Sequence, residues 1–123
     1  MADLMSFQCI EMAVFDATTL TGSYQVMNGA AQQADTGAVG FSDDIKILKI
    51  YNDGSTGVTI SFDSVVKNDY LPSKGTMIID LQSNHSTAAT YGNGTLNGRK
   101  GQLVYGKGSA SSAGLNIYIS GYR

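Results

Sequence analysis

The chain has 123 residues, a length at which roughly two-thirds of the unfolded surface is buried on folding, so we expect one domain with one core. Charged residues make up only 15% of the chain and glycines number 15, which is typical of turns and strands more than of helices. The formal net charge is −2. Nucleic acid is disfavoured as the main partner, because phosphate binding needs clustered Lys and Arg.

The cysteine content and the N-terminal segment limit where the protein works. Cys9 is the only cysteine, so an internal disulfide is excluded. The opening "MADLMSFQCI" has no basic n-region, and its apolar run is too short for a signal peptide or a membrane span. We therefore expect no membrane partner and a protein that is made and kept, or assembled, in the cytoplasm.

The first half of the chain carries four predicted strands. The segments "SFQCIEMAVF" and "SYQVMN" predict a first pair of strands, with a helix over residues 8–15 as the alternative for the earlier segment. A strand follows in "DIKILKIYN", where the apolar residues change phase, as a bulge or burial on both faces would explain. The clearest alternation runs over residues 58–63, with Val58, Ile60 and Phe62 on one face.

Three further apolar runs complete the pattern, in "GTMIIDLQ", "GQLVYGKG" and "LNIYISGYR". About seven strands separated by turns predict an all-β fold, a single-domain antiparallel β-sandwich over residues 1–123 that is jelly-roll-like. Residues 1–44 form either part of this sandwich or an extended, less regular N-terminal part. The irregular stretches 29–41 and 83–100 are the first candidates for a partner surface, because long loops in compact domains are often functional.

The turn-forming segment "IYNDGSTGVTISFDS" raises the question of a metal site. A calcium loop needs oxygen ligands spread over about twelve residues and a closing Glu, and no Glu follows here. Asn52, Asp53 and Gly54 are instead typical of a tight hairpin. We predict a hairpin that is shaped by Asp53, with Asp63 at the solvent face or the end of its second strand.

Catalytic and metal-binding patterns are weak in this sequence. Asp63, Asp69 and Asp80 would serve acid–base hydrolysis only if the fold brought them together, and solvated strand ends are the alternative. His85 lies in a polar loop and Cys9 in an apolar strand, so neither a Cys–His couple nor a zinc site is expected. The run "GNGTLNGRKGQ" lacks the spacing of a phosphate-binding P-loop. We expect no catalytic residue, no cofactor and no metal.

The aromatic residues are mainly tyrosines, which serve strand cores and partly wet protein interfaces alike. A nucleic-acid stacking platform would pair them with a basic groove, which this sequence lacks. The basic pair in "GRKG" either stays solvated or meets an acidic partner surface. The residues that we expect at a partner interface are His85, Tyr91, Arg99, Lys100 and Tyr122.

A pattern from Ile45 to the C-terminus resembles a set of small virion proteins of tailed bacteriophages. Those proteins carry a hairpin with Tyr-Asn and Ser-Phe-Asp, then Asp-Tyr-Leu-Pro, an Asp-Leu-x-x-Asn segment and a closing Val/Ile-Tyr-x-Ser strand near a Tyr terminus. In this chain the corresponding segments are Tyr51–Asn52, Ser61–Asp63, Asp69–Pro72, Asp80–Asn84 and Ile117–Tyr122.

The resemblance implies a non-enzymatic β-sandwich component of the virion that acts by assembly. A capsid decoration or cement protein on the outside of the head is the first expectation, with the major capsid protein or other virion proteins as partners. A collar, neck or tail-associated component is the second. Such a protein stabilises an assembled lattice by binding it in preference to its separate parts, and a homo-oligomer, most simply a trimer, would fit a lattice axis.

Two readings from other classes of protein stay open. A carbohydrate-binding module would present a coplanar aromatic platform or a pocket lined by Asp and Asn, and it would bind glycans as an isolated chain. A hydrolase would lose a turnover, without unfolding, when Asp63 or Asp80 is changed to Ala.

Overall fold

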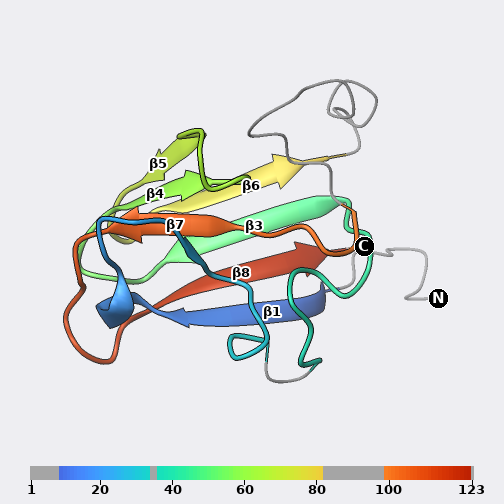
Figure 1. The fold of residues 1–123 in the computed structure, drawn as a ribbon, viewed down its shortest axis with the longest axis horizontal. Helices are drawn as coiled ribbons and strands as arrows, with labels where there is room; N and C mark the ends of the chain where they lie inside the picture. The colour runs from blue at the N-terminus through green and yellow to red at the C-terminus, as the bar shows by residue number, and fades with distance from the viewer. Residues whose placement is uncertain (1–8, 34–35, 82–98, 123) are drawn as a thin grey trace.

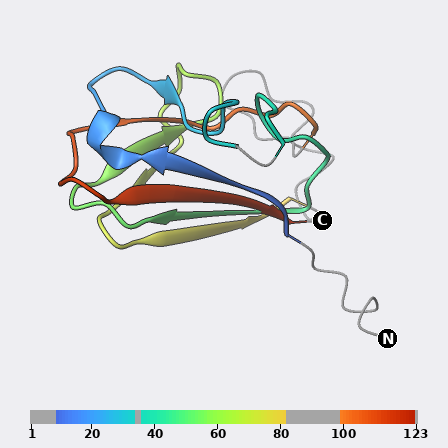
Figure 2. The ribbon, with the colours of Figure 1, turned by 90° about the horizontal axis from the view of Figure 1, so that it is seen from below.

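A computed structural model describes residues 9–33, 36–81 and 99–122 of the chain (Figure 1). Its strands form two four-stranded sheets that lie face to face, as the edge-on view in Figure 2 shows. Sheet A contains, in spatial order, β1 (Cys9–Asp16), β8 (Asn116–Tyr122), β3 (Ile47–Asn52) and β6 (Thr76–Asp80). Sheet B contains, in spatial order, β2 (Gln25–Val26), β7 (Tyr105–Gly108), β4 (Val58–Ser61) and β5 (Asp69–Leu71).

The strand order is that of a jelly roll. The first strand pairs with the eighth, the second with the seventh, the third with the sixth and the fourth with the fifth, all antiparallel. This nesting corresponds to one long hairpin rolled up into two sheets. The all-β sandwich predicted from the sequence is therefore confirmed, with eight strands in the described residues against the expected seven or so. The only helical element there is one 3₁₀ turn, η2 (Ala17–Thr19), and no described helix has the length and apolar character that crossing a membrane requires.

Two expected strand pairings are wrong, and so is the alternative helix. The segment of β1 is a strand, but it pairs with β8 and not with β2, which lies in the other sheet. Likewise β3 and β4 do not form a hairpin: the turn between them carries the chain from sheet A to sheet B. The three-residue strand β5 was missed, because "NDYLP" contains one inward apolar residue, Leu71, and no alternation.

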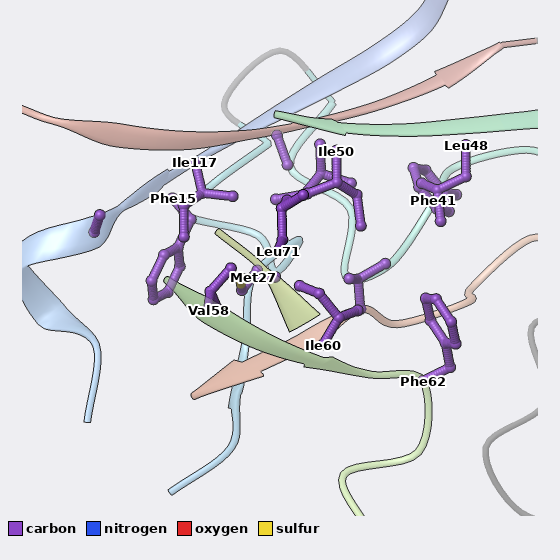
Figure 3. Packing of buried hydrophobic residues seen from close by; sticks show 14 of the residues in the cluster. Phe15, Met27, Phe41, Leu48, Ile50, Val58, Ile60, Phe62, Leu71 and Ile117 are labelled. Carbon is purple, nitrogen blue, oxygen red and sulfur yellow. The ribbon is translucent and has the colours of Figure 1, made fainter. Parts of the chain in front are cut away.

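The core lies between the sheets and takes alternate residues of each strand. From sheet A, Ile50 and Ile117 point inward, and from sheet B, Val58 and Ile60 meet them, all four without solvent exposure (Figure 3). Alternation along β3 leaves Leu48, Ile50 and Asn52 inside. Burying such aliphatic side chains contributes about 1.5–3 kcal/mol each, which makes this contact the main source of stability.

A buried amide holds the turns at one end of the sandwich together. Asn52 ends β3 with no solvent exposure, and its Nδ2 donates to the carbonyl oxygen of Thr56 at 2.8 Å. The same Nδ2 lies 3.3 Å from the carbonyl oxygens of Leu71 and Pro72, and its Oδ1 accepts from the backbone N–H of Gly54 at 2.9 Å. One side chain thus satisfies backbone groups in two of the segments that connect the sheets, β3 to β4 and β5 to β6.

The loop over residues 29–41 has two buried side chains, one that holds the loop together and one that packs on the sandwich. Gln33 is 1% exposed, and its Nε2 lies 2.8 Å from the carbonyl oxygen of Asn28 and 2.9 Å from that of Ala38. Phe41 packs over Gly121 of β8, where an added Cβ would lie 3.0 Å from the ring. The described part of this loop is therefore a structural element with its own buried anchors.

Removing the Asn52 amide tests this connection. We expect Asn52→Ala to lower the free energy of unfolding by about 2–3 kcal/mol, because it leaves buried carbonyl and N–H groups without partners. Asn116→Ala is the matched control, since Asn116 is half-buried at the start of β8, and its effect should stay within about 0.5 kcal/mol. Urea denaturation of both variants measures the difference, and equal effects would contradict the role of Asn52.

Candidate functional site

The outer face of sheet A is lined by large side chains from all four of its strands. Antiparallel register places Val14, Tyr118, Tyr51 and Thr76 in one row across the sheet. The next row contains Met12, Ser120, Lys49 and Ile78. No other described element lies on this face, which is the lower surface of the molecule in Figure 2.

Several of these apolar side chains are open to solvent. Met12 is 47% exposed, Val14 41% and Ile78 66%. Scattered exposed apolar residues are normal on protein surfaces, whereas a contiguous set across one sheet face indicates an interaction site. Tyrosine and methionine are also the residue types that protein interfaces favour.

A hollow of about 430 Å³ lies in the middle of this face. Its floor is Ser120, which is only 7% exposed because the side chains beside it in the same sheet are larger and stand above it. We call it the tyrosine hollow, and its lining residues are Met12, Lys49, Tyr51, Thr76, Tyr118, Ser120 and Tyr122. A depression between aromatic side chains on a rigid sheet can receive a projecting side chain from a partner.

Two tyrosines form one side of the hollow. The rings of Tyr51 and Tyr118 stack across β3 and β8, with centroids 6.2 Å apart and planes inclined by 13°. The hydroxyl of Tyr51 donates to Oδ1 of Asp53 at 3.1 Å. This hydrogen bond raises the pKa of Tyr51 above its ordinary value, so the phenol stays protonated. Stacking and hydrogen bonding together fix the ring of Tyr51 before any partner arrives.

An ion pair sits beside this stack, at the end of β3. Nζ of Lys74 lies 2.7 Å from Oδ1 of Asp53 and also donates to the carbonyl oxygen of Asp53 at 2.8 Å. The hydrogen bond from Lys74, and secondarily that from Tyr51, lowers the pKa of Asp53. The same contact raises the pKa of Lys74. Asp53 therefore stabilises the turn and orients Tyr51.

The outer face of sheet B has a different character. Thr59 and Lys107 are paired there, and Nζ of Lys107 lies 4.6 Å from the ring centre of Tyr24. Tyr70 is 55% exposed, with its hydroxyl held over Gly57, where an added Cβ would collide with it. Polar side chains and one cation–π contact thus replace the apolar row of sheet A.

The interface residues expected from the sequence fall in different places. Tyr122 lines the tyrosine hollow. Arg99 and Lys100 are exposed in a separate loop, where the backbone N–H of Lys100 donates to Oδ1 of Asp44 at 2.7 Å. His85 and Tyr91 lie outside the described residues.

The three aspartates considered for hydrolysis do not form a cluster. Within residues 9–33, 36–81 and 99–122, no group of three or more His, Cys, Asp or Glu side chains is placed to hold a metal ion. Oδ1 of Asp63 accepts from the backbone N–H groups of Val65 and Val66 at 2.9 Å each, so it caps the turn after β4. Asp69 begins β5 and Asp80 ends β6, in different sheets.

Of the residues that line the tyrosine hollow, only Tyr122 was predicted from the sequence as an interface residue. The sequence nevertheless contains a pattern that indicates an apolar outer face on sheet A. In "NIYISGY" the isoleucines occupy one face of the strand and the tyrosines the other, so both faces are largely apolar. Strands of this kind are typical of sheets covered on both sides. The phase change in "DIKILKIYN" is the same signal: Ile45 is buried before the strand begins, and within it Ile47 and Tyr51 face outward.

Comparison with known proteins found no family model, no curated protein and no solved structure that matches this chain.

The Asp53–Lys74 contact predicts a pH-dependent contribution to stability. Because the pKa of Asp53 is lowered in the folded protein, the contact contributes its full stability above pH 3.8, the ordinary aspartate pKa. This stability is lost as the pH falls through the lowered pKa. Because the pKa of Lys74 is raised, the contact also contributes its full stability below pH 10.5, the ordinary lysine pKa. This stability is lost as the pH rises through the raised pKa.

We therefore expect Lys74→Met to lower stability slightly near neutral pH and to have a smaller effect in strong acid, where protonation of Asp53 removes the ion pair and leaves the hydrogen bond from Nζ to the carbonyl oxygen of Asp53. Lys67→Met, at an exposed lysine in the turn between β4 and β5, is the control and should show no pH-dependent difference. Urea denaturation over a pH series measures this. A difference between Lys74→Met and wild type that is as large in strong acid as at neutral pH would contradict the ion pair as its source.

Proposed function

We propose that this chain is a non-enzymatic virion structural protein that decorates and stabilises the assembled head of a tailed phage. The observation that carries the proposal is the outer face of sheet A, where apolar and tyrosine side chains surround the tyrosine hollow. Such a face is suited to binding protein, since aromatic and methionine side chains are enriched in interfaces and tyrosine is among the residues that contribute most to binding energy. The resemblance of the C-terminal part of the sequence to small virion proteins provides the context.

The fold supports this proposal by analogy. Jelly rolls recur in viral capsid proteins and in lectins, although a fold alone does not assign a function. The outer face of sheet A is built on four hydrogen-bonded strands, so little conformational entropy is lost when a partner docks on it. Binding to the assembled lattice in preference to free subunits would stabilise the particle by mass action without any turnover.

Lys49 gives the face its charge preference. Lys49 lines the hollow, and none of the described residues forms an ion pair with it. An acidic or carbonyl-rich segment on the capsid surface therefore fits the hollow better than a basic one. The major capsid protein is the partner that we propose, and a collar, neck or tail protein is the alternative within the virion.

Heads of the phage that encodes this chain, prepared without it, provide the direct test. We expect the purified protein to co-sediment with these heads and to raise their melting temperature, which differential scanning calorimetry measures. A protein that neither binds the heads nor raises their melting temperature would rule out decoration. Binding to isolated necks or tails alone would move the protein to that part of the virion.

A charge placed on the hollow should abolish docking without harming the fold. We expect Met12→Glu to weaken binding to heads at least tenfold, or about 1.4 kcal/mol, because its carboxylate would be buried against an acidic or carbonyl-rich partner segment. Val65→Glu is the matched control, since Val65 is 73% exposed in the turn after β4 and lies away from sheet A. Equal loss for both variants, or for neither, would exclude this face as the docking surface.

Glycan binding is the second candidate, because hydroxyl groups of Thr76 and Ser120 lie beside tyrosine rings in the hollow. Tyr51 and Tyr118 stack on each other, however, which differs from the coplanar platform expected of a carbohydrate-binding module. A glycan array probed with the isolated chain separates the two functions. Binding of a defined glycan that Tyr118→Ala abolishes would favour the carbohydrate module.

A further inference from the structure

Strand β6 forms one edge of sheet A, and among the described residues no strand pairs with its outer side. In the antiparallel ladder, Leu81 donates to Lys46 and Asn52 donates to Gly75, so the odd-numbered residues of β6 bond to β3. Alternation then directs the backbone N–H and C=O groups of Thr76, Ile78 and Asp80 away from β3. For Thr76 and Ile78, these groups have no hydrogen-bond partner in the described part of the chain.

The other three sheet edges are protected in recognisable ways. The edge strand β1 contains a register shift between Cys9 and Glu11, and its Val14 N–H donates to the carbonyl oxygen of Gln32. Strand β2 has two residues, and β5 has three and is followed at once by Pro72. Bulges, covering loops, short length and proline are the devices by which proteins prevent pairing at an edge. Strand β6, over its five residues, has a regular register and no Pro, Gly or Lys.

We propose that β6 pairs with β6 of a second copy of this chain, antiparallel about a two-fold axis at Ile78, so that two copies of sheet A become one continuous eight-stranded sheet. A two-fold contact of this kind is isologous, with the same patch on both chains. It goes beyond the proposed docking on capsid and does not depend on it.

The side chains of β6 are complementary to themselves in this register. On the outer face, Ile78 meets Ile78 of the other copy, which covers an apolar side chain that is 66% exposed in the single chain. On the inner side, Met77 meets Ile79 of the other copy, and both are partly buried residues that already pack against the core. Thr76 lies opposite Asp80, so a hydroxyl faces a carboxylate and no like charges are opposed.

Other registers are less favourable. With the two-fold axis at Met77 or Ile79, the pairing would use only residues 76–78 or 78–80 of each strand. A shift that places the two-fold axis at Asp80 would bring two carboxylates face to face. A shift that places it at Thr76 would require Lys74 to continue the strand, but Lys74 has a φ of 65° and lies in the turn before β6. The register centred on Ile78 is the one that uses the whole strand from Thr76 to Asp80.

The pairing would also extend the outer face of sheet A. The row that contains Met12, Lys49 and Ile78 would continue across the two-fold axis into the second copy, so that two tyrosine hollows lie on one sheet. A contact of one strand pair is small, and it would strengthen when both copies are held on the same lattice, because their effective concentration rises.

Charge substitutions at Ile78 provide the test. Because position 78 faces itself across the axis, Ile78→Lys and Ile78→Glu should each give the mass of one chain, through like-charge repulsion. An equimolar mixture of the two variants should recover the mass of two chains, as the wild type has. Sedimentation equilibrium over a concentration series measures the masses, and Val65→Lys, at a 73% exposed position in the turn after β4, should remain a dimer.

Several results would overturn the pairing. These are a wild-type protein that is monomeric at its highest soluble concentration, a mass of three chains, charge variants that stay dimeric, or a mixture that does not recover the dimer. Circular dichroism establishes that the variants are folded. If they are not, hydrogen exchange of the wild type decides: the Ile78 amide should exchange more slowly as concentration rises, and an unchanged rate would contradict the pairing.

Discussion

The amide of Asn52 is the constraint on which the arrangement of this sandwich depends. The chain crosses between the sheets after β3 and again after β5, and Asn52 hydrogen-bonds to backbone groups of both crossings. Its own backbone also donates to Gly75 and accepts from Lys74. A fully satisfied buried amide of this kind specifies one geometry, because any other leaves polar groups without partners.

The position of the candidate site follows from that constraint. Asp53 follows Asn52 in the chain, and the backbone N–H of Lys74 donates to the carbonyl oxygen of Asn52. Nζ of Lys74 lies 2.7 Å from Oδ1 of Asp53, which also accepts from the hydroxyl of Tyr51. Tyr51 in turn stacks on Tyr118, which helps to shape the tyrosine hollow. A polar connection between the sheets thus helps to set the geometry of an aromatic surface on the outside of one of them.

The two sheets differ in the polarity of their outer faces. Sheet B has an apolar inner face and a largely polar outer face, as expected of a sheet in contact with water. Sheet A has apolar residues on both faces, which costs solubility unless the outer face is covered. The same sheet carries β6, an edge with a regular register and no Pro, Gly or Lys. Both proposals above, docking on the outer face of sheet A and pairing along β6, therefore concern this one sheet, where the described residues place no other element.

Local sequence patterns determined which residues form most strands and which side of each strand is apolar. Val58, Ile60 and Phe62 were placed on one apolar face from alternation alone, and all three are buried. The predicted sandwich followed from the number of such segments and the turns between them. A side-chain period of two is a property of a few neighbouring residues, so a single sequence is sufficient to find it.

Only the tertiary structure decided which strands pair and where the tyrosines gather. In a jelly roll, β1 meets β8 across almost the whole chain, and no local pattern records a partner at that separation. For the same reason Asn52 and Asp53 were assigned to a hairpin, whereas the turn connects two sheets. The tyrosine hollow draws on all four strands of sheet A. It exists only once cross-strand register places Met12, Lys49 and Tyr118 around Ser120.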